Sequence, residues 1–167
     1  LEFDQPTGRF LEVYAGPAAL PYALGDLDRD GKTELVTQIG STLQVFESPS
    51  WDTYPSVATF SIPIGSNFQC GATVADSDSD GRPEIIFSEN HISTSRLRIL
   101  EARADDEFAV VFDEDTSPGA TGRKLIADFD GDGRQEILFT GSDAIVLLYE
   151  AISDDQWVRT WEQEEGL

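Results

Sequence analysis

Short apolar segments alternate with polar, glycine-containing stretches along most of this 167-residue chain. β-branched and aromatic residues dominate the apolar segments, which is typical of strands, and no stretch sustains the 3.6-residue period of a helix. The pattern therefore predicts an all-β protein. The expected strands are residues 9–14 and then three groups of four: 22–25, 35–39, 43–47 and 57–62; 72–75, 84–88, 96–101 and 108–112; and 124–127, 136–140, 144–150 and 157–161.

Turn-forming residues separate these segments. Gly40-Ser41 predicts a tight hairpin in the first group, and residues 141–143 predict one in the third. In the second group, residues 89–95 predict a longer polar connection. The carboxylate runs elsewhere are expected in polar loops, where turn chemistry explains the Asp residues without catalysis: 105–107, 113–115 and 154–155.

Each group of four strands contains one acidic nonamer between its first and second strands. The nonamers are residues 26–34, 76–84 and 128–136, and each reads Asp-x-Asp-x-Asp-Gly-x-x-Glu. Their first residues are 50 and 52 positions apart. Internal repetition with a period of this length indicates a solenoid or a propeller, in which each repeat is one supersecondary unit.

The nonamers carry the chemistry of a hard cation site. Gly at the sixth place permits a tight bend that turns the carboxylates inward, and calcium takes about 6–8 oxygen ligands, backbone carbonyls included. The nonamers contain no His or Cys, which argues against zinc and copper. We therefore predict three Ca²⁺ sites, with side-chain ligands at places one, three, five and nine and a carbonyl ligand at place seven: Asp26, Asp28, Asp30, Lys32 and Glu34; Asp76, Asp78, Asp80, Arg82 and Glu84; and Asp128, Asp130, Asp132, Arg134 and Glu136.

An EF-hand shares the first six places of this pattern. It also needs a bidentate Glu at place twelve and flanking helices. Place twelve is occupied here by Thr37, Phe87 and Phe139, and strand-like segments follow each nonamer. The EF-hand interpretation is therefore rejected for all three copies.

The three nonamers, each preceded by a short apolar stretch and followed by a strand, resemble the FG-GAP or VCBS-type repeat. That family forms the β-propeller of integrin α-subunits, several fungal lectins and many secreted bacterial proteins. The resemblance covers roughly residues 20–163. It implies structural calcium in hairpin loops on one rim of the propeller. The family most often has Asp at the ninth place, where this chain has Glu34, Glu84 and Glu136.

The resemblance implies four-stranded antiparallel blades: blade 1 at residues 20–63, blade 2 at 70–112 and blade 3 at 122–163. Residues 1–19 would then supply the outer strand of a preceding blade and a linker. A propeller closes with typically 4–8 blades, so three blades predict a partial propeller within a single segment, 1–167. We expect either a piece of a larger ring, a homo-oligomer that completes one, or an arc capped by something else.

Charge limits the possible partners. The chain has 32 acidic and 11 basic residues, for a net charge of −21. Nucleic acid is therefore a poor partner, because binding phosphates needs clusters of Lys and Arg. No apolar run is long enough to cross a bilayer.

The remaining residues say less about chemistry and compartment. Cys70 is the only cysteine and is expected to pack as a small apolar side chain, while His91, the only histidine, falls in a polar connection. No signal peptide is visible and the chain begins at Leu1, as a mature or excised fragment would. Calcium sites with Kd of roughly 10⁻⁴–10⁻³ M suit extracellular calcium levels, so we expect a secreted or surface location, extracellular or periplasmic.

Three functions follow from the sequence. The first is a calcium-stabilised module that mediates adhesion or binds a protein or glycan. The second is a lectin, with stacking candidates Trp51, Tyr54, Trp157 and Trp161; for each of them, packing between blades or along the outer strand is the favoured interpretation. The third is part of a polysaccharide-active enzyme; because no catalytic motif is present, we expect no catalysis within this segment.

Overall fold

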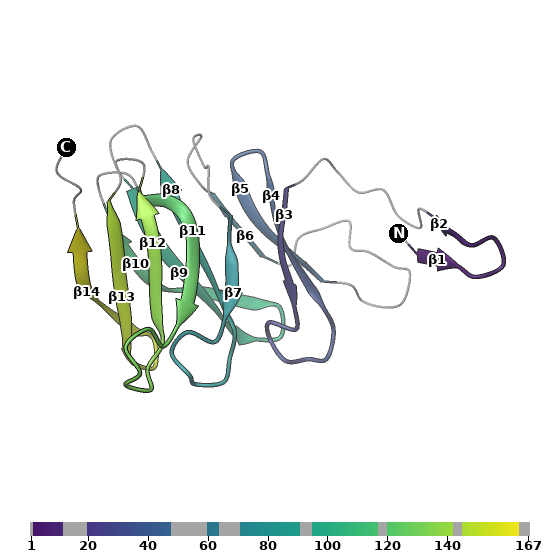
Figure 1. Cartoon of the computed structure of the whole chain (residues 1–167). Coiled ribbons are helices and arrows are strands. Elements are labelled where there is room, and N and C mark those ends of the chain that lie inside the picture. The colour runs from purple at the N-terminus through teal and green to yellow at the C-terminus, as the bar shows by residue number, and fades with distance from the viewer. Residues whose placement is uncertain are drawn as a thin grey trace.

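The protein is all-β throughout the residues that its computed structural model describes, as the sequence predicted. These residues are 2–11, 20–47, 60–63, 71–90, 95–116, 120–141 and 145–163. They contain strands and no helix, and therefore no helix that could cross a membrane. Three four-stranded antiparallel sheets and one two-stranded sheet are formed (Figure 1).

The three larger sheets, called blades 1 to 3 here, are meanders in which neighbouring strands are consecutive in the chain. All twelve of their strands overlap predicted strands. Their bounds are β3 Leu20–Gly25, β4 Glu34–Ile39, β5 Thr42–Glu47 and β6 Phe60–Pro63 in blade 1; β7 Thr73–Ala75, β8 Glu84–Asn90, β9 Ser95–Ala104 and β10 Glu107–Asp115 in blade 2; and β11 Ala120–Ala127, β12 Glu136–Gly141, β13 Val146–Ser153 and β14 Gln156–Gln163 in blade 3.

Blade 2 corrects two predictions about polar segments. Glu89 and Asn90 continue β8 and pair with Arg96 and Ser95, so the connection is shorter than predicted. Residues 113–115, and also Glu107 of the run predicted at 105–107, belong to β10 and not to a loop. The reason is cross-strand charge pairing, which stabilises a sheet even where the sequence is polar; for example, the Arg96 Nε lies 2.6 Å from an Asp113 oxygen.

The N-terminal segment forms a small sheet of its own. The strand predicted at residues 9–14 is present as β2 (Arg9–Leu11), and it pairs antiparallel with β1 (Glu2–Asp4), a partner that the sequence did not predict. This pair lies outside the three blades (Figure 1). The rest of the predicted strand lies outside the described residues.

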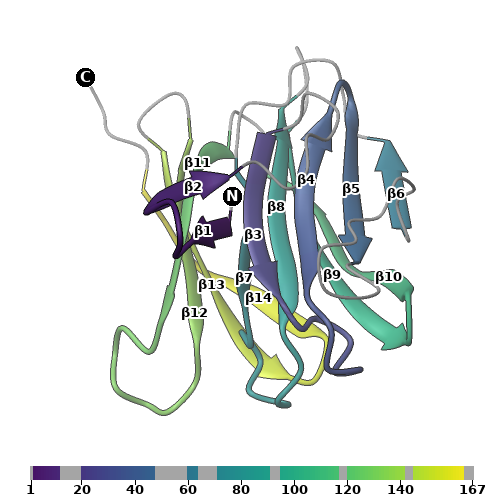
Figure 2. The same cartoon turned by 90° about the vertical axis from the view of Figure 1, so that its right-hand side faces the viewer.

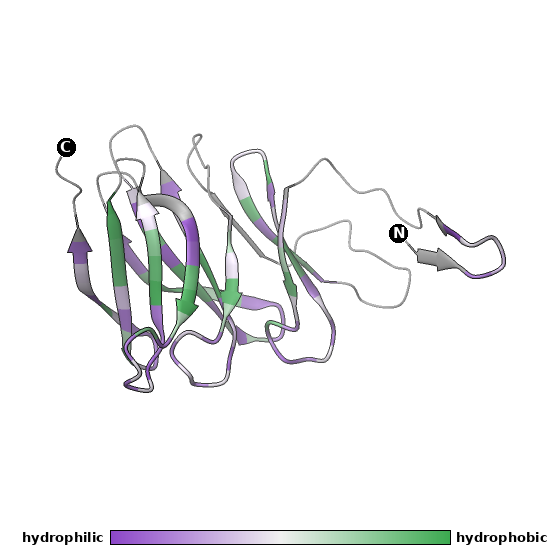
Figure 3. Cartoon of the chain, in the orientation of Figure 1, coloured by the Kyte–Doolittle hydropathy of each residue, from purple (hydrophilic) through white to green (hydrophobic). Residues whose placement is uncertain are grey.

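Two hydrophobic clusters hold the blades together, and each lies between two neighbouring blades. Leu27, Val36 and Val45 of blade 1 pack on Ile85 and Phe87 of blade 2 in the first cluster. The second cluster joins the opposite face of blade 2 to blade 3; its members include Ile86, Leu97, Ile99, Ile137, Phe139, Leu147, Tyr149 and Trp157. Figure 3 shows the apolar residues along the strands and the hydrophilic ones along the lower loops.

The position of blade 2 explains its sequence. Successive side chains of a strand point to opposite faces, so Ile85 and Phe87 face blade 1 while Ile86 faces blade 3. All three are fully buried. A strand covered on both faces reads as a continuous apolar run rather than an alternating one.

Among the described residues, no further sheet packs on the outward face of either end blade, and the described sheets do not close into a ring. Leu24 of blade 1 is 69% exposed, and Leu125 and Phe129 of blade 3 are 57% and 47% exposed. Phe129 occupies the second place of its nonamer, where Leu27 of the first is 1% exposed beneath blade 2. Leu27 is buried because blade 2 packs against blade 1 on that side, whereas no described blade packs on the corresponding side of blade 3.

The three acidic nonamers lie at one edge of the blades. Each connects the first and second strands of its blade, and the blades are stacked in the same orientation, so the loops fall at the lower edge of Figures 1 and 2. Neighbouring loops approach each other, since a Cβ on Gly81 would lie 2.9 Å from a guanidinium nitrogen of Arg29.

We predict that packing between blades carries much of the stability. Phe139 is 1% exposed and stacks on Tyr149 with ring centroids 5.7 Å apart. Phe139→Ala is expected to lower the free energy of unfolding by about 3–5 kcal/mol through lost burial and the cavity left behind. Ile152→Ala, at a side chain that is 43% exposed, should change it by less than about 0.5 kcal/mol. Urea unfolding in saturating calcium measures both, and equal losses would contradict the prediction.

Candidate metal centre

The three acidic loops share one backbone conformation. In each, the fourth and sixth places have positive φ, a left-handed conformation that glycine adopts without strain. The sixth place is the predicted Gly, and the fourth place varies in sequence without changing the bend. The φ angles are 68° and 89° at Arg29 and Gly31, 63° and 91° at Ser79 and Gly81, and 82° and 95° at Gly131 and Gly133.

Backbone N–H groups hold the Asp side chains over their own loop. The third-place carboxylate accepts a hydrogen bond from the N–H of place five, and the fifth-place carboxylate accepts one from place seven. In loop 2 these are Asp80 N to Asp78 Oδ1 at 3.2 Å and Arg82 N to Asp80 Oδ1 at 2.6 Å. The same two bonds occur in loops 1 and 3. The predicted inward turn of the carboxylates is therefore built into the backbone.

The ninth-place Glu is the buried member of each loop. Glu34, Glu84 and Glu136 are 0%, 0% and 2% exposed. In each, Oε2 accepts a hydrogen bond from the backbone N–H of place two, at 2.5 Å from Leu27, 2.6 Å from Ser77 and 2.6 Å from Phe129. The other oxygen, Oε1, is buried in all three and accepts no hydrogen bond from the described residues.

An unpartnered buried carboxylate oxygen is costly, because the charge loses water without gaining a donor. The pKa is raised to about 7 for Glu34 and to about 8 for Glu84, chiefly by burial and in part by the Asp carboxylates of the same loops, against a smaller lowering by the hydrogen bonds from place two. The pKa of Glu136 is raised by the same causes. In each loop, either a proton or a bound cation would therefore reduce the cost of burying this carboxylate.

The predicted side-chain ligands converge in space. In loop 2 and in loop 3, one oxygen from each of the four acidic residues lies within 4.8 Å of the others. In loop 1 the convergent group is Asp26, Asp28 and Glu34. Asp30 is held instead by Lys32, with Nζ 2.5 Å from its Oδ2, and this bond lowers the pKa of Asp30.

The seventh-place side chains make a repeated contact that the sequence analysis missed. Lys32, Arg82 and Arg134 each bond to a glutamate near the end of the third strand of their blade: Glu47 at 2.9 Å, Glu101 at 3.2 Å and Glu150 at 2.5 Å. The signal was present as a Glu at a corresponding place in every repeat. These ion pairs tie loop to sheet, while the predicted carbonyl ligation by the same three residues stays a prediction.

The aromatic residues predicted as candidates for sugar stacking differ in their exposure. Trp157 is 4% exposed and packs edge-on against Phe112 with ring centroids 5.7 Å apart, so it belongs to the core and is not available to a ligand. Trp161 is 44% exposed. Trp51 and Tyr54 lie outside the described residues, as do Cys70 and His91.

The raised pKa values predict how stability depends on pH without metal. A Glu whose pKa is higher in the folded than in the unfolded state stabilises the fold at low pH, and the contribution is lost as pH rises from about 4.5 through 7–8. In a chelator, Glu84→Gln is therefore expected to be more stable than the native protein at pH 8 and nearly equal to it at pH 4.5.

Urea midpoints of the two proteins at both pH values measure this difference. In saturating calcium at pH 8 the order should reverse, because the variant loses a charged ligand. A difference between the two metal-free proteins that does not vary with pH would contradict the assigned burial of this carboxylate.

Comparison with known families agrees with this geometry. Residues 26–87 match the family model described as the FG-GAP-like repeat. The matched span runs from the first Asp of loop 1 to Phe87 in β8 and thus contains the first two loops. A search of curated proteins finds no match. The predicted resemblance to FG-GAP-type repeats is confirmed over residues 26–87, in a chain built of propeller-like blades.

Proposed function

We propose that this protein is a calcium-stabilised interaction module of a secreted or cell-surface protein, with one structural Ca²⁺ in each acidic loop. The observation that supports it most is the buried Oε1 of the ninth-place Glu, which has no partner in the described part of the chain and recurs in all three loops. A cation beside that oxygen would remove the cost of burying it. The repetition argues against an accident of packing at one site.

The donor set suits calcium. Each loop offers several carboxylates and no nitrogen or sulfur side-chain ligand, which excludes a preference for softer metals. Calcium accepts irregular sets of about 6–8 oxygens, whereas magnesium demands near-octahedral geometry. The proposed side-chain ligands are the Asp at places one, three and five and the Glu at place nine; in loop 1, Asp30 would bind only if it exchanged Lys32 for the ion.

The cation would act on stability. Each loop joins two adjacent strands, and its carboxylates repel one another when no cation is present. If free calcium is about 100 times Kd, binding stabilises the folded state by ~2.7 kcal/mol per site. Three such sites would together rival the ~5–15 kcal/mol stability of an ordinary domain.

The proposed role is binding rather than catalysis. The carboxylates at 105–106 and 154–155 lie in two-residue turns, and those at 113–115 lie in a strand, so none needs a catalytic explanation. A net charge of −21 favours a protein or glycan partner over nucleic acid. Weak calcium sites are suited to an extracellular or periplasmic setting, which is the proposed location.

We predict that chelation destabilises the protein strongly. Transfer from millimolar calcium to EDTA is expected to lower Tm by more than about 10 °C, given ~2.7 kcal/mol per site and about 2–4 °C per kcal/mol. Differential scanning calorimetry measures the shift, and the same concentration of magnesium should restore less of it. An unchanged Tm in EDTA would reject the proposal.

A variant in one loop tests the stoichiometry. Isothermal titration of the native protein is expected to give three calcium equivalents, and Asp76→Asn should give two because it removes a carboxylate from loop 2. Glu162→Gln is the matched control, since this residue pairs with Arg159 in β14 and lies in no loop. Loss of an equivalent in the control, or three in Asp76→Asn, would contradict the assignment.

A further inference from the structure

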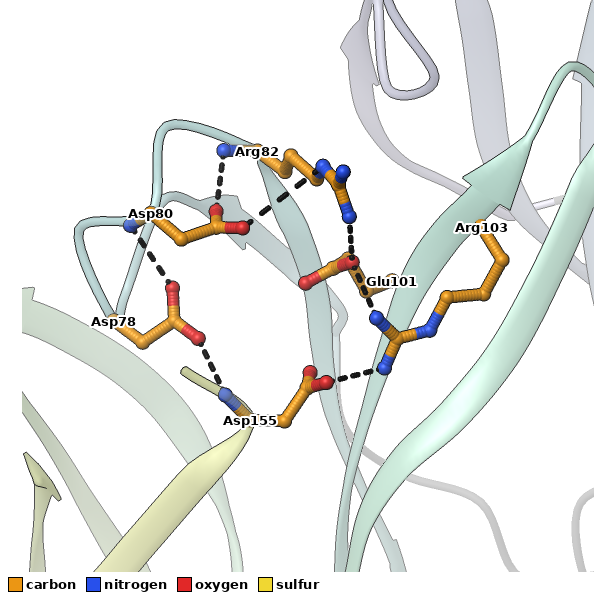
Figure 4. Close-up of polar contacts among 6 residues, drawn as sticks. All are labelled: Asp78, Asp80, Arg82, Glu101, Arg103 and Asp155. Carbon is orange, nitrogen blue, oxygen red and sulfur yellow. Dashed lines mark hydrogen bonds and ion pairs between the residues drawn. The ribbon is translucent and has the colours of Figure 1, made fainter. Parts of the chain in front are cut away.

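Two hairpin turns reach across blade boundaries to the acidic loops. The backbone N–H of Asp106, in the β9–β10 turn of blade 2, donates to Asp28 Oδ2 in loop 1 at 2.9 Å. The N–H of Asp155, in the β13–β14 turn of blade 3, donates to Asp78 Oδ2 in loop 2 at 2.8 Å (Figure 4). In both cases the outer hairpin of the following blade contacts the third-place Asp of the preceding blade.

The two turns are built alike. Asp106 and Asp155 have φ of 59° and 57°, the left-handed conformation that Asp tolerates better than most residues. Each is the second residue of a two-residue turn, between the pairs Ala104–Glu107 and Ser153–Gln156. At both junctions, the backbone N–H of the second turn residue thus donates to the third-place Asp of the preceding blade.

Each turn also brings negative charge to the loop that it contacts. At the junction of blades 2 and 3, Asp154 and Asp155 join Asp78 and Glu101, with one oxygen from each residue within 4.8 Å of the others. At the junction of blades 1 and 2, the corresponding group is Asp28, Glu47, Asp105 and Asp106. Like charges at such distances repel, most strongly where water is excluded.

Arginines offset part of this repulsion at the junction of blades 2 and 3. Arg82 and Arg103 donate to the same Glu101 oxygen at 3.2 and 3.0 Å, and Arg103 also pairs with Asp155. Figure 4 shows these contacts closing a ring of six residues through Asp78 and Asp80. Two guanidinium groups face five carboxylates in this region, counting Asp154, so the junction retains a negative excess.

We infer that the outer hairpin of each following blade belongs to the metal site of the preceding blade, so that cation binding at loops 1 and 2 is coupled to the docking of adjacent blades. This inference rests on the proposed function. The hairpin N–H would fix the third-place carboxylate from its outer side, as partners around a metal ligand do. The cation would in turn neutralise the repulsion between loop and hairpin.

The coupling is reciprocal by thermodynamic necessity. If a docked hairpin raises the affinity for the cation by some factor, the bound cation raises the equilibrium constant for hairpin docking by the same factor. Asp106 and Asp155 are therefore positioning residues, which act on the cation through Asp28 and Asp78. They lie 78 and 77 positions away from those residues in the sequence.

Loop 3 differs from the other two. Among the described residues, no hairpin reaches Asp130, the third-place residue of loop 3. The side chain beside it, Phe129, is 47% exposed, whereas Leu27 and Ser77 at the same place are 1% and 0% exposed. Loop 2 brings the same four carboxylates together as loop 3, so loop 3 is expected to bind calcium more weakly than loop 2, by about 10-fold, the lower range for loss of a partner to a metal ligand.

A calcium titration of the ¹⁵N-labelled protein, followed by amide resonances, tests the coupling. Gly31, Gly81 and Gly133 report the three loops directly. The amide of Asp106 is expected to shift with the midpoint of Gly31 and that of Asp155 with the midpoint of Gly81, while Gly133 titrates at about 10-fold higher calcium than Gly81.

Loop variants separate coupling from a general change in the fold. Asp76→Asn should abolish the Asp155 response and spare that of Asp106, and Asp26→Asn should do the reverse. An Asp155 amide that stays still while Gly81 titrates, or that responds equally in both variants, would overturn the inference. If no loop glycine responds to calcium, the proposed function fails and the inference fails with it.

Substitution of the hairpin residue provides a second test that needs no loop variant. Asp155→Gly keeps the N–H and the left-handed backbone, whereas Asp155→Val disfavours that conformation and displaces the donor. The Gly81 midpoint is expected to rise about 10-fold in Asp155→Val relative to Asp155→Gly, with the Gly31 and Gly133 midpoints unchanged. Equal Gly81 midpoints in the two variants would overturn the inference, as would a shift at all three glycines.

Discussion

The buried glutamate that ends each acidic loop connects the chemistry of the loop to the architecture of the blade. Its Oε2 fixes the start of the loop through the backbone N–H of place two, and its backbone begins the second strand of the blade. Its Oε1 is buried and has no donor among the described residues. A loop that closes around this residue brings Asp carboxylates to it, three in loops 2 and 3 and two in loop 1, so local folding and the proposed cation affinity have one origin.

Packing between blades is the second constraint. Each blade buries apolar side chains against its neighbour rather than around a core of its own, as in other repeat architectures where stability is shared across interfaces. Ile85, Ile86 and Phe87 show the consequence, because three successive residues of one strand are buried by two different neighbours. The exposed Leu24 and Leu125 mark where this stacking ends among the described blades.

Charge and packing meet at the edge where the loops lie. The apolar clusters bring adjacent blades together, and the outer hairpins then place Asp106 and Asp155 against Asp28 and Asp78. Without a cation, this arrangement concentrates like charges at each junction. Lys32, Arg82 and Arg103 relieve part of that concentration through their ion pairs with Glu47, Glu101 and Asp155.

The sequence by itself determined the strands, the acidic loops and the bend at the sixth-place Gly, because alternation and turn chemistry act between residues close in the chain. The sequence did not predict features that depend on contacts between residues far apart in the chain. Only the tertiary structure decided that residues 113–115 lie in a strand, that Trp157 is buried while Trp161 is exposed, and that Phe129 is exposed where Leu27 is covered. It alone showed that Asp106 and Asp155 reach loops about 80 positions earlier. Such contacts depend on the order in which the sheets pack against one another, and no local pattern of residues encodes that order.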